Sequence, residues 1–318
     1  MIIITFIRKL IVDLRFRLAN DRQGRRKIVC KNNTHFLKRE LYFCNFCMHP
    51  FLNNKTVVIT GASSGIGKAL AGTALAAGAR VAVCARSLGR LENAFDGADR
   101  GQLMLVQADV AREEDCSRFI AAVAARWGGI DILVNNAGMS MRALFADLEI
   151  RVLRELMDVN FWGTVYMTKA ALPYIQQAGG SIVGVSSIAG YRGLPARTGY
   201  SSSKFAMQGF LESLRTELLY SGVHVMWASP GFTASNIRNV ALGADGSAQK
   251  ETPLDEQKLM SAESCAALIW KGVEKRKRTL VMTAQGRATV WLNKLFPGMM
   301  DKMVYRHFAK EPGSPLKK

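Results

Sequence analysis

The chain has 318 residues, of which 49% are hydrophobic, with 28 glycines and 8 prolines, so collagen-like and disordered proteins are excluded. The formal net charge of +18 would by itself suggest nucleic acid or an anionic membrane as a partner. The charge is concentrated at the two ends, however, because residues 1–47 carry +8, residues 271–318 carry +9 and residues 48–270 carry only +1. A nucleic-acid-binding domain needs positive charge on its folded face, so we expect no nucleic-acid ligand.

The first 47 residues are basic and show no sustained period of two or 3.6. We expect residues 1–47 to lie outside the folded domain, either as a disordered tail or because the native protein starts at Met48. The first apolar run meets Arg8 and Lys9 too soon for a signal peptide or a spanning helix. Six cysteines without a signal peptide indicate a reducing compartment, so we expect a cytoplasmic protein.

A zinc clip is the alternative interpretation of this N-terminal segment, because Cys-x-x-Cys is a common metal-ligand spacing. Only one residue separates the last two candidate ligands, which strains a tetrahedral site, and no second well-spaced pair follows. We therefore predict no metal site. The candidate ligands would be His35, Cys44, Cys47 and His49.

From residue 55 onward, short apolar runs rich in β-branched residues alternate with longer helical stretches. Continuous apolar strands joined by helices indicate a parallel sheet that is covered on both faces. We predict an α/β fold, a Rossmann-like doubly wound parallel sheet of seven strands in a single domain over residues 48–285, with a C-terminal extension at 286–318. The predicted strands are residues 55–60, 80–85, 102–107, 130–135, 181–187, 223–229 and 278–283.

A glycine-rich loop, TGASSGIG at residues 60–67, follows the first predicted strand and opens the first helix. Glycines allow the backbone to turn sharply and approach a ligand, and free amides at a helix start attract phosphate. The alternative is a tight strand-to-helix turn without a ligand. The candidate phosphate contacts are Gly61, Ser63, Ser64, Gly65, Ile66 and Gly67.

The second predicted strand ends in Ala85 and is followed by Arg86. A carboxylate at this place would bind the ribose hydroxyl of NAD, whereas an arginine suits the 2'-phosphate of NADP. The sequence therefore favours NADP over NAD, with Arg90 as a weaker second contact. The alternative for Arg86 is an ordinary solvated loop arginine.

Tyr200 and Lys204 are four residues apart, so on a helix they share one face. A phenol titrates near pH 10 and is a poor acid or base at neutrality. A nearby ammonium favours the phenolate, and together with the charge of an oxidised nicotinamide it would lower the pKa of Tyr200. The alternative is a Tyr and a Lys on an exposed helix face.

Over residues 55 to about 285 the sequence resembles the short-chain dehydrogenase/reductase family in its seven-stranded form. Four motifs in the same order carry the resemblance: the loop at 60–67, Asn135–Gly138, Tyr200-Ser-Ser-Ser-Lys204 and Pro230–Gly231. The resemblance implies hydride transfer between NADP and a carbonyl or secondary alcohol, without a metal.

The resemblance implies that Tyr200 is the general acid in reduction and that Ser187 holds the substrate oxygen. It also implies that Lys204 tunes Tyr200 and binds the nicotinamide ribose, while Asn160 holds a water of a proton relay. Ser186 precedes Ser187, and in an alternating strand only one of the two can reach the site. Further cofactor contacts implied by the resemblance are Asp109, Val110, Asn136, Ala137 and Gly138 on the adenine side, and Pro230, Gly231 and Thr233, with Ser235 as a substitute for Thr233, at the nicotinamide.

We predict reduction of an apolar, lipid-like ketone or aldehyde. The competing hypothesis is a catalytically silent NADP-binding sensor or scaffold at a membrane surface. Candidate apolar wall residues are Met139, Met141, Leu194, Pro195, Phe232, Ile237, Val240, Leu242 and Met260.

The C-terminal extension is split into two short pieces by Pro297 and Gly298. We favour a flap packed on the pocket or on a partner subunit. The alternative is an interfacial helix that would place the protein at the periphery of a membrane. The resemblance also implies a homodimer or homotetramer, formed through the Tyr200 helix and the helix before its strand.

Overall fold

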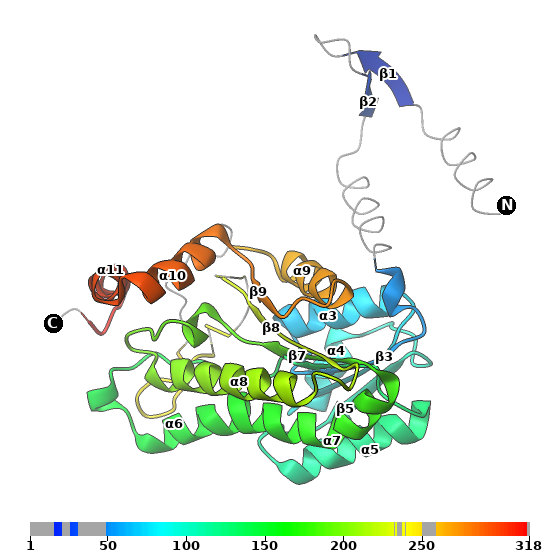
Figure 1. Ribbon diagram of the computed structural model, residues 1–318, viewed down its shortest axis with the longest axis horizontal. Coiled ribbons are helices and arrows are strands. Elements are labelled where there is room, and N and C mark those ends of the chain that lie inside the picture. The colour runs from blue at the N-terminus through cyan, green and yellow to red at the C-terminus, as the bar shows by residue number, and fades with distance from the viewer. Residues whose placement is uncertain are drawn as a thin grey trace. The chain divides into compact units, whose positions relative to one another are not determined.

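The computed structural model describes strands 16–20 and 26–30 and residues 49–231, 233, 237–238, 240–249 and 259–316. The chain divides into two compact units, Met1–Met48 and His49–Lys318. In the first unit, β1 (Phe16–Asn20) pairs antiparallel with β2 (Arg26–Cys30), as Figure 1 shows. The sequence had predicted no regular structure here, because strands of this length are too short to establish a period. His35, Cys44 and Cys47 of the considered zinc clip lie outside the described residues.

The second unit is built on one parallel sheet with the strand order β5-β4-β3-β6-β7-β8-β9. The predicted doubly wound, seven-stranded fold is therefore confirmed. The strands are β3 (Thr56–Thr60), β4 (Arg80–Ala85), β5 (Leu103–Gln107), β6 (Ile132–Asn135), β7 (Ser181–Val185), β8 (His224–Ser229) and β9 (Thr279–Val281).

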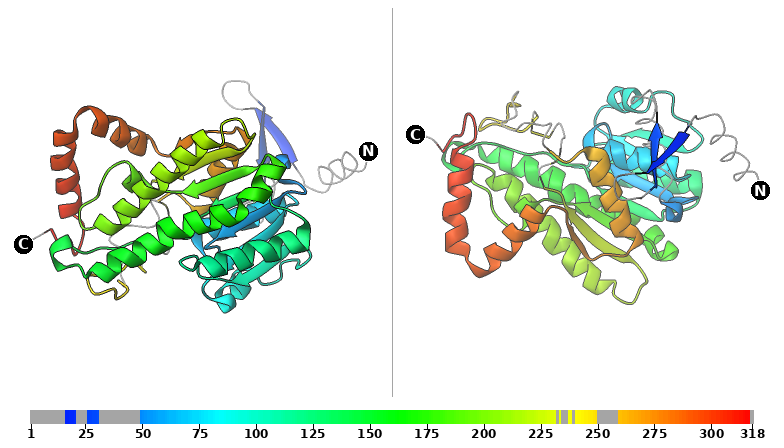
Figure 2. Two further views of the ribbon diagram at one scale, coloured as in Figure 1. Left: turned by 60° about the horizontal axis from the view of Figure 1, so that its bottom comes forward. Right: turned by 90° about the horizontal axis from the view of Figure 1, so that it is seen from above.

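Helices cover both faces of this sheet (Figures 1 and 2). Residues of α3 and α9 pack on one face, and residues of α5, α7 and α8 pack on the other. The helices are α3 (Gly65–Ala76), α4 (Leu88–Ala94), α5 (Glu113–Trp127), α6 (Ile150–Met157), α7 (Gly163–Ala178), α8 (Thr198–Glu217), α9 (Ala262–Glu274), α10 (Ala284–Leu295) and α11 (Pro297–Ala309). Shorter helical turns are η1 (Pro50–Leu52), η2 (Phe145–Asp147), η3 (Asp158–Trp162) and η4 (Ile188–Gly190).

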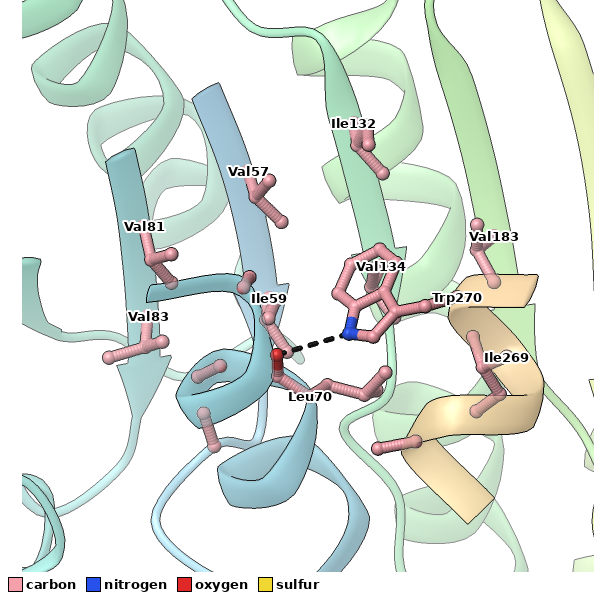
Figure 3. Packing of buried hydrophobic residues seen from close by; sticks show 14 of the residues in the cluster. Val57, Ile59, Leu70, Val81, Val83, Ile132, Val134, Val183, Ile269 and Trp270 are labelled. Atoms are coloured by element: carbon pink, nitrogen blue, oxygen red, sulfur yellow. Dashed lines mark hydrogen bonds between the residues drawn. The ribbon is translucent and has the colours of Figure 1, made fainter. Parts of the chain in front are cut away.

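Trp270 of α9 lies at the centre of one of the two main hydrophobic clusters (Figure 3). It is fully buried, and its indole Nε1 donates a hydrogen bond to the carbonyl oxygen of Leu70 in α3 at 3.2 Å. Successive side chains of β3 point to opposite faces, so Val57 and Ile59 join this cluster while Val58 joins the other. Because both faces are buried, the strands are continuously apolar, which is why they could be found in the sequence.

The strand order reverses at β3, which has β4 on one side and β6 on the other. Ligands of open α/β sheets bind at the carboxyl ends of the strands next to such a reversal. The glycine loop follows β3, Arg86 follows β4, and Asn136 to Gly138 follow β6. The topology therefore brings these sequence motifs to one edge of the sheet.

The C-terminal extension forms two helices, and Pro297 stands at the first position of α11. Met300, Val304 and Phe308 are buried and pack with Leu194. In both views of Figure 2, α11 lies beside the start of α8. The extension therefore packs on a residue that also lines the cavity described below.

No helix among the described residues is long and apolar enough to cross a membrane.

Candidate active site

A cavity of about 420 Å³ lies at the carboxyl ends of the strands and is lined by nearly every site residue predicted from the sequence. Ser187, Tyr200 and Lys204 border it, whereas Asn160 and Gly67 do not. The predicted cofactor contacts that line the cavity are Gly61, Ser63, Ser64, Gly65, Ile66, Arg86, Asp109, Val110, Asn136, Ala137, Gly138, Tyr200, Lys204, Pro230, Gly231 and Thr233.

Gly61 has the backbone angle φ = +66°, which L side chains rarely adopt, and a Cβ there would lie 2.7 Å from Cα of Ala137. The loops after β3 and β6 therefore cross in close contact at Gly61 and Ala137. Asn136 joins these two loops, since its Nδ2 donates to the carbonyl oxygens of Thr60 at 2.9 Å and Gly61 at 3.0 Å. A Cβ on Gly67 would lie 2.4 Å from that same Nδ2. Gly67 therefore keeps space for Asn136 and does not line the cavity itself.

The start of α3 borders this cavity with Ser64, Gly65 and Ile66. Its N-cap residue, Ser64, makes no side-chain capping hydrogen bond, and the first N–H groups of a helix have no partner within it. Such amides and the positive end of the helix dipole fit a phosphate. The start of α3 is therefore a candidate binding site for a phosphate group.

Two exposed arginines line the cavity after β4: Arg86 directly follows the strand, and Arg90 lies in α4. The carbonyl oxygen of Arg86 accepts a hydrogen bond from Nε2 of Gln107 at 3.0 Å, which fixes its backbone. Among the described residues that line the cavity, Asp109 is the one carboxylate, and its Oδ1 accepts the amide of Ala111 at 3.0 Å. Two guanidinium groups therefore lie at this end of the cavity.

Tyr200 lies in the first turn of α8 and forms a side-chain hydrogen bond with Ser187. Burial raises the pKa of Tyr200 above its ordinary value, while this hydrogen bond and the charges of Arg197 and Arg238 act to lower it. The net direction is opposite to the lowering expected from Lys204, because desolvation of the phenolate outweighs the favourable contacts here. A phenol in this state is protonated at neutral pH and is suited to donate a proton.

Lys204 is buried, with 3% of its surface exposed. Its Nζ donates to the carbonyl oxygen of Val185 at 2.9 Å and lies 5.9 Å from the ring centroid of Tyr200. The expected juxtaposition of the two side chains on one helix face is therefore present. Burial lowers the pKa of Lys204 to about 8, because the charged ammonium is poorly solvated.

Asn160 is fully buried in η3, a single π-helical turn between α6 and α7. Its Oδ1 accepts the amide of Met139 at 2.8 Å, and its Nδ2 donates to the Met139 carbonyl at 3.0 Å and to Oγ of Ser203 at 2.8 Å. A Cβ on Gly138 would lie 3.1 Å from this Oδ1 and 3.4 Å from Nζ of Lys204. Asn160 thus stands behind the cavity wall and fixes the backbone after β6.

Ser186 also borders the cavity, contrary to the expectation that only one of the two serines could reach it. The reason is that β7 ends at Val185, so the alternation of a strand does not extend to residues 186 and 187. The hydroxyl of Ser186 accepts a hydrogen bond from Nε2 of Gln208 at 2.9 Å. Ser187 instead accepts the amide of Ala189 and meets Tyr200.

The substrate side of the cavity differs from the predicted apolar wall. Met139, Leu194, Ile237 and Val240 line it, as expected. Met141 and Leu242, two further candidates for the wall, are buried in a separate core cluster. Pro195 borders a second cavity, and Met260 forms an isolated β-bridge with Thr233. The wall candidate Phe232 and the cofactor candidate Ser235 lie outside the described part of the chain.

Sequence reasoning missed two arginines of this cavity, Arg197 and Arg238. Arg197 lies three residues before Tyr200, which is the one signal that could have indicated it. Arg238 lies directly after Ile237 and five residues after Thr233, both predicted at the site, so its place in the chain could have indicated it.

No group of three or more potential metal ligands occurs in the part of the chain that the structure describes. His49, the described member of the considered clip, is buried with its ring edge against Phe51, and burial lowers its pKa.

Comparisons of the sequence with known proteins all point to one family of dehydrogenases. The family model for short chain dehydrogenases matches residues 55–243. "Dehydrogenase/reductase SDR family member 7B" of Mus musculus is 33% identical over 269 residues, which cover 82% of this chain and 83% of that protein. "11-beta-hydroxysteroid dehydrogenase 1A" of Arabidopsis thaliana is 33% identical over 283 residues, which cover 84% and 81%.

Solved structures share the fold. A short-chain dehydrogenase from Streptomyces avermitilis has a TM-score of 0.69 at 27% identity, with 80% of this chain and 97% of the other covered. A short chain dehydrogenase from Burkholderia cenocepacia J2315 in complex with NADP has a TM-score of 0.67 at 23% identity, with 80% and 98% covered.

The burial of Lys204 predicts a pH dependence of stability. The pKa of the folded state, about 8, lies below the ordinary value of 10.5, so between these pH values the unfolded chain binds a proton that the folded chain does not. The free energy of unfolding should therefore rise with pH across this window, by about 3 kcal/mol.

Urea denaturation between pH 7 and 11 gives the free energy of unfolding of the wild type and of Lys204→Met at each pH. The difference between the two proteins should change across this window by the contribution of Lys204. A difference that stays constant with pH would show that Lys204 titrates at its ordinary pKa.

Proposed function

The chain belongs to the short-chain dehydrogenase family of oxidoreductases, and on this premise we propose that it is an NADP-dependent carbonyl reductase. The observation that carries the proposal is the meeting of Ser187, Tyr200 and Lys204 with the glycine loop in one cavity. A protein that only binds the cofactor has no need of a hydrogen-bonded serine and tyrosine at this place. The proposed reaction adds a hydride and a proton to a ketone or aldehyde and yields the alcohol.

The chemical roles follow from the positions of the side chains. When bound, the reduced nicotinamide supplies the hydride. Ser187 and Tyr200 donate hydrogen bonds to the carbonyl oxygen, and Tyr200 gives its proton as negative charge develops there. The raised pKa of Tyr200 keeps the phenol protonated at neutral pH, which is the form that donates a proton during reduction.

Lys204 supplies positive charge behind the phenol and binds the ribose of the nicotinamide. With a pKa of about 8, its ammonium form prevails at neutral pH. Asn160 holds Met139 and Gly138 in place beside Lys204, and we propose that it also holds the water of a proton relay.

Arg86 supports the assignment of NADP as the cofactor. It is exposed at the end of β4 beside Arg90, and no carboxylate follows β4 that would repel a phosphate. The remaining predicted contacts complete the proposed binding site. They run from Asp109 and Val110 at the adenine to Pro230, Gly231 and Thr233 at the nicotinamide.

An apolar ketone is the proposed substrate class. Met139, Leu194, Ile237 and Val240 give the substrate side an apolar lining. A relative bears the name of a hydroxysteroid dehydrogenase, which favours a large apolar carbonyl compound over a small polar one. Tests should therefore extend from small aldehydes to steroid and long-chain ketones.

We propose a homodimer or homotetramer through α7 and α8. Trp162, beside the start of α7, and Phe205 of α8 are both about half exposed, at 43% and 46%, which fits a face that a second copy covers. Light scattering measures the mass in solution.

We also propose that α10 and α11 touch the surface of an anionic membrane. Each of these helices exposes two large apolar side chains that are four residues apart and therefore share one helix face. They are Trp291 and Leu295 in α10, and Met299 and Met303 in α11. The surrounding cations complement anionic headgroups. They are Arg287, Lys294, Lys302 and Arg306.

Replacing Tyr200 by Phe should lower turnover of NADPH with a ketone by at least about a thousandfold, because the proton donor is lost. Binding of NADPH, followed by fluorescence, should remain within a few fold. Tyr220→Phe is the matched control, since Tyr220 is 97% exposed. Unchanged turnover in Tyr200→Phe would refute the mechanism.

Inactivity of the wild type across the whole substrate panel, with NADPH bound, would favour the sensor or scaffold.

Replacing Arg86 by Ala should raise KM for NADPH about tenfold or more while changing KM for NADH little, because only NADPH carries the 2'-phosphate. Arg118→Ala is the control, since Arg118 is exposed and pairs with Asp115 away from the cavity. Equal changes of both KM values would contradict the assignment of NADP.

The double substitution of Trp291 and Met303 by Ser should reduce sedimentation with vesicles of phosphatidylserine and phosphatidylcholine several fold, because apolar area leaves the interface. Tyr220→Ser serves as the control. If the double variant and the control sediment equally with the vesicles, the exposed faces of α10 and α11 do not contact the membrane.

A further inference from the structure

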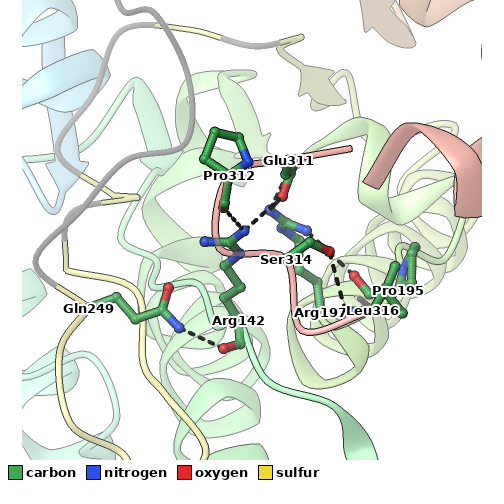
Figure 4. Close-up of polar contacts among 8 residues, drawn as sticks. All are labelled: Arg142, Pro195, Arg197, Gln249, Glu311, Pro312, Ser314 and Leu316. Atoms are coloured by element: carbon green, nitrogen blue, oxygen red, sulfur yellow. Dashed lines mark hydrogen bonds and ion pairs between the residues drawn. The ribbon is translucent and has the colours of Figure 1, made fainter. Parts of the chain in front are cut away.

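Glu311, in the last described turn of the chain, is a carboxylate that is 94% buried, since only 6% of its surface is exposed. Its two oxygens accept hydrogen bonds from Nη2 of Arg197 at 3.0 and 3.3 Å. Nη2 of Arg142 lies 3.6 Å from the same carboxylate. Figure 4 shows the two arginines meeting at this one residue. Burying three charged groups is costly unless each is paired, so the arrangement fixes all three side chains together.

The two arginines belong to the two loops that frame the substrate side of the cavity. Arg142 follows Met139 and Ser140, which line the cavity, and Arg197 lines it directly beside Leu194. Arg142 also donates to the carbonyl oxygen of Pro312 at 2.6 Å. One C-terminal segment therefore holds both loops.

Arg197 is also the residue that precedes α8 and forms its N-cap, three positions before Tyr200. Its carbonyl oxygen accepts the amide of Ser201 at 2.9 Å, within the turn that carries Tyr200. A displacement of Arg197 would therefore also displace the first turn of α8, which carries Tyr200.

The backbone before this helix needs external support. Ala196 has φ = +57°, a conformation that L side chains rarely adopt. Its carbonyl oxygen accepts the amide of Ala143 at 3.0 Å, which ties it to the Arg142 loop. Such a conformation persists only where surrounding contacts enforce it, and Arg197 supplies one of these contacts through Glu311.

Phe308 of α11 reinforces the same contact. The guanidinium of Arg197 lies 4.5 Å from the centroid of the Phe308 ring, and Phe308 packs with Leu194. The side chain of Arg197 is thus held by a carboxylate and by an aromatic face, both from the C-terminal extension.

We propose that Glu311 is a positioning residue for the hydroxyl of Tyr200, acting through Arg197 at the start of α8. The C-terminal extension is then a part of the catalytic apparatus that sets the geometry of the proton donor. This inference rests on the proposed role of Tyr200 in carbonyl reduction.

Glu311→Gln keeps the shape of the side chain and one oxygen acceptor but removes the charge that holds both arginines. We expect kcat for NADPH-dependent ketone reduction to fall about 10- to 100-fold, because small displacements of a catalytic group are costly. KM for NADPH should stay within about twofold, since the glycine loop and Arg86 are untouched. Glu311→Asp, which keeps the charge on a shorter side chain, should recover part of kcat.

The kinetic isotope effect with NADPH deuterated at the transferred hydrogen separates positioning from loss of folded protein. If Tyr200 is misplaced, the chemical step becomes slower and the isotope effect on kcat rises. If Glu311→Gln only lowers the folded fraction, kcat falls while the isotope effect stays at the wild-type value, and the proposal is wrong.

Asp301→Asn is the matched control, because Asp301 is an acid of the same extension that pairs with Arg192 and does not touch Arg197. It should retain the wild-type kcat. Tyr200→Phe is measured in parallel: if it stays active, the proposed function fails, and if it is inactive while Glu311→Gln keeps the wild-type kcat, only the positioning role fails.

Discussion

The parallel pairing of β3 with both β4 and β6 is the constraint on which the site depends. Because the chain reverses its winding direction at β3, the loops after these strands diverge and leave a crevice at the carboxyl edge. The close crossing of Gly61 and Ala137, held by the side-chain amide of Asn136, fixes the width of this crevice. A side chain at residue 61 would force the two loops apart, and the cavity could not keep its shape.

Burial governs the electrostatics of the catalytic side chains. It raises the pKa of Tyr200 and lowers that of Lys204, because both charged forms lose solvation. The two shifts move the pKa values of the donor and its neighbour apart, because that of Tyr200 rises above 10.0 while that of Lys204 falls from 10.5 to about 8. Ser187, Arg197 and Arg238 oppose the shift of Tyr200, so its acidity depends on loops that lie far apart in sequence.

The C-terminal extension connects the periphery of the domain with the site. One face of α11 is buried against Leu194, and the turn that follows α11 buries Glu311 between Arg142 and Arg197. Met299 and Met303 of the same helix are exposed. The extension therefore supports the loops that frame the cavity through its contacts with Leu194, Arg142 and Arg197, and none of its described residues lines the cavity itself.

The sequence alone determined the sheet, the seven strands and most of the cavity lining. Strands buried on both faces are continuously apolar, so they could be found in the sequence. The glycine loop, the Tyr200–Lys204 pair and Arg86 are local patterns, and the resemblance to the short-chain dehydrogenase/reductase family supplied most of the other predicted lining residues. The sequence did not indicate the hairpin of β1 and β2, the cavity contact of Ser186 or the exclusion of Gly67 and Asn160 from the lining. Those features depend on where strands end and on packing between distant residues. Only the tertiary structure decided that Arg142, Arg197 and Glu311 form one buried cluster, because ion pairs between residues more than a hundred positions apart leave no periodic signal in the sequence.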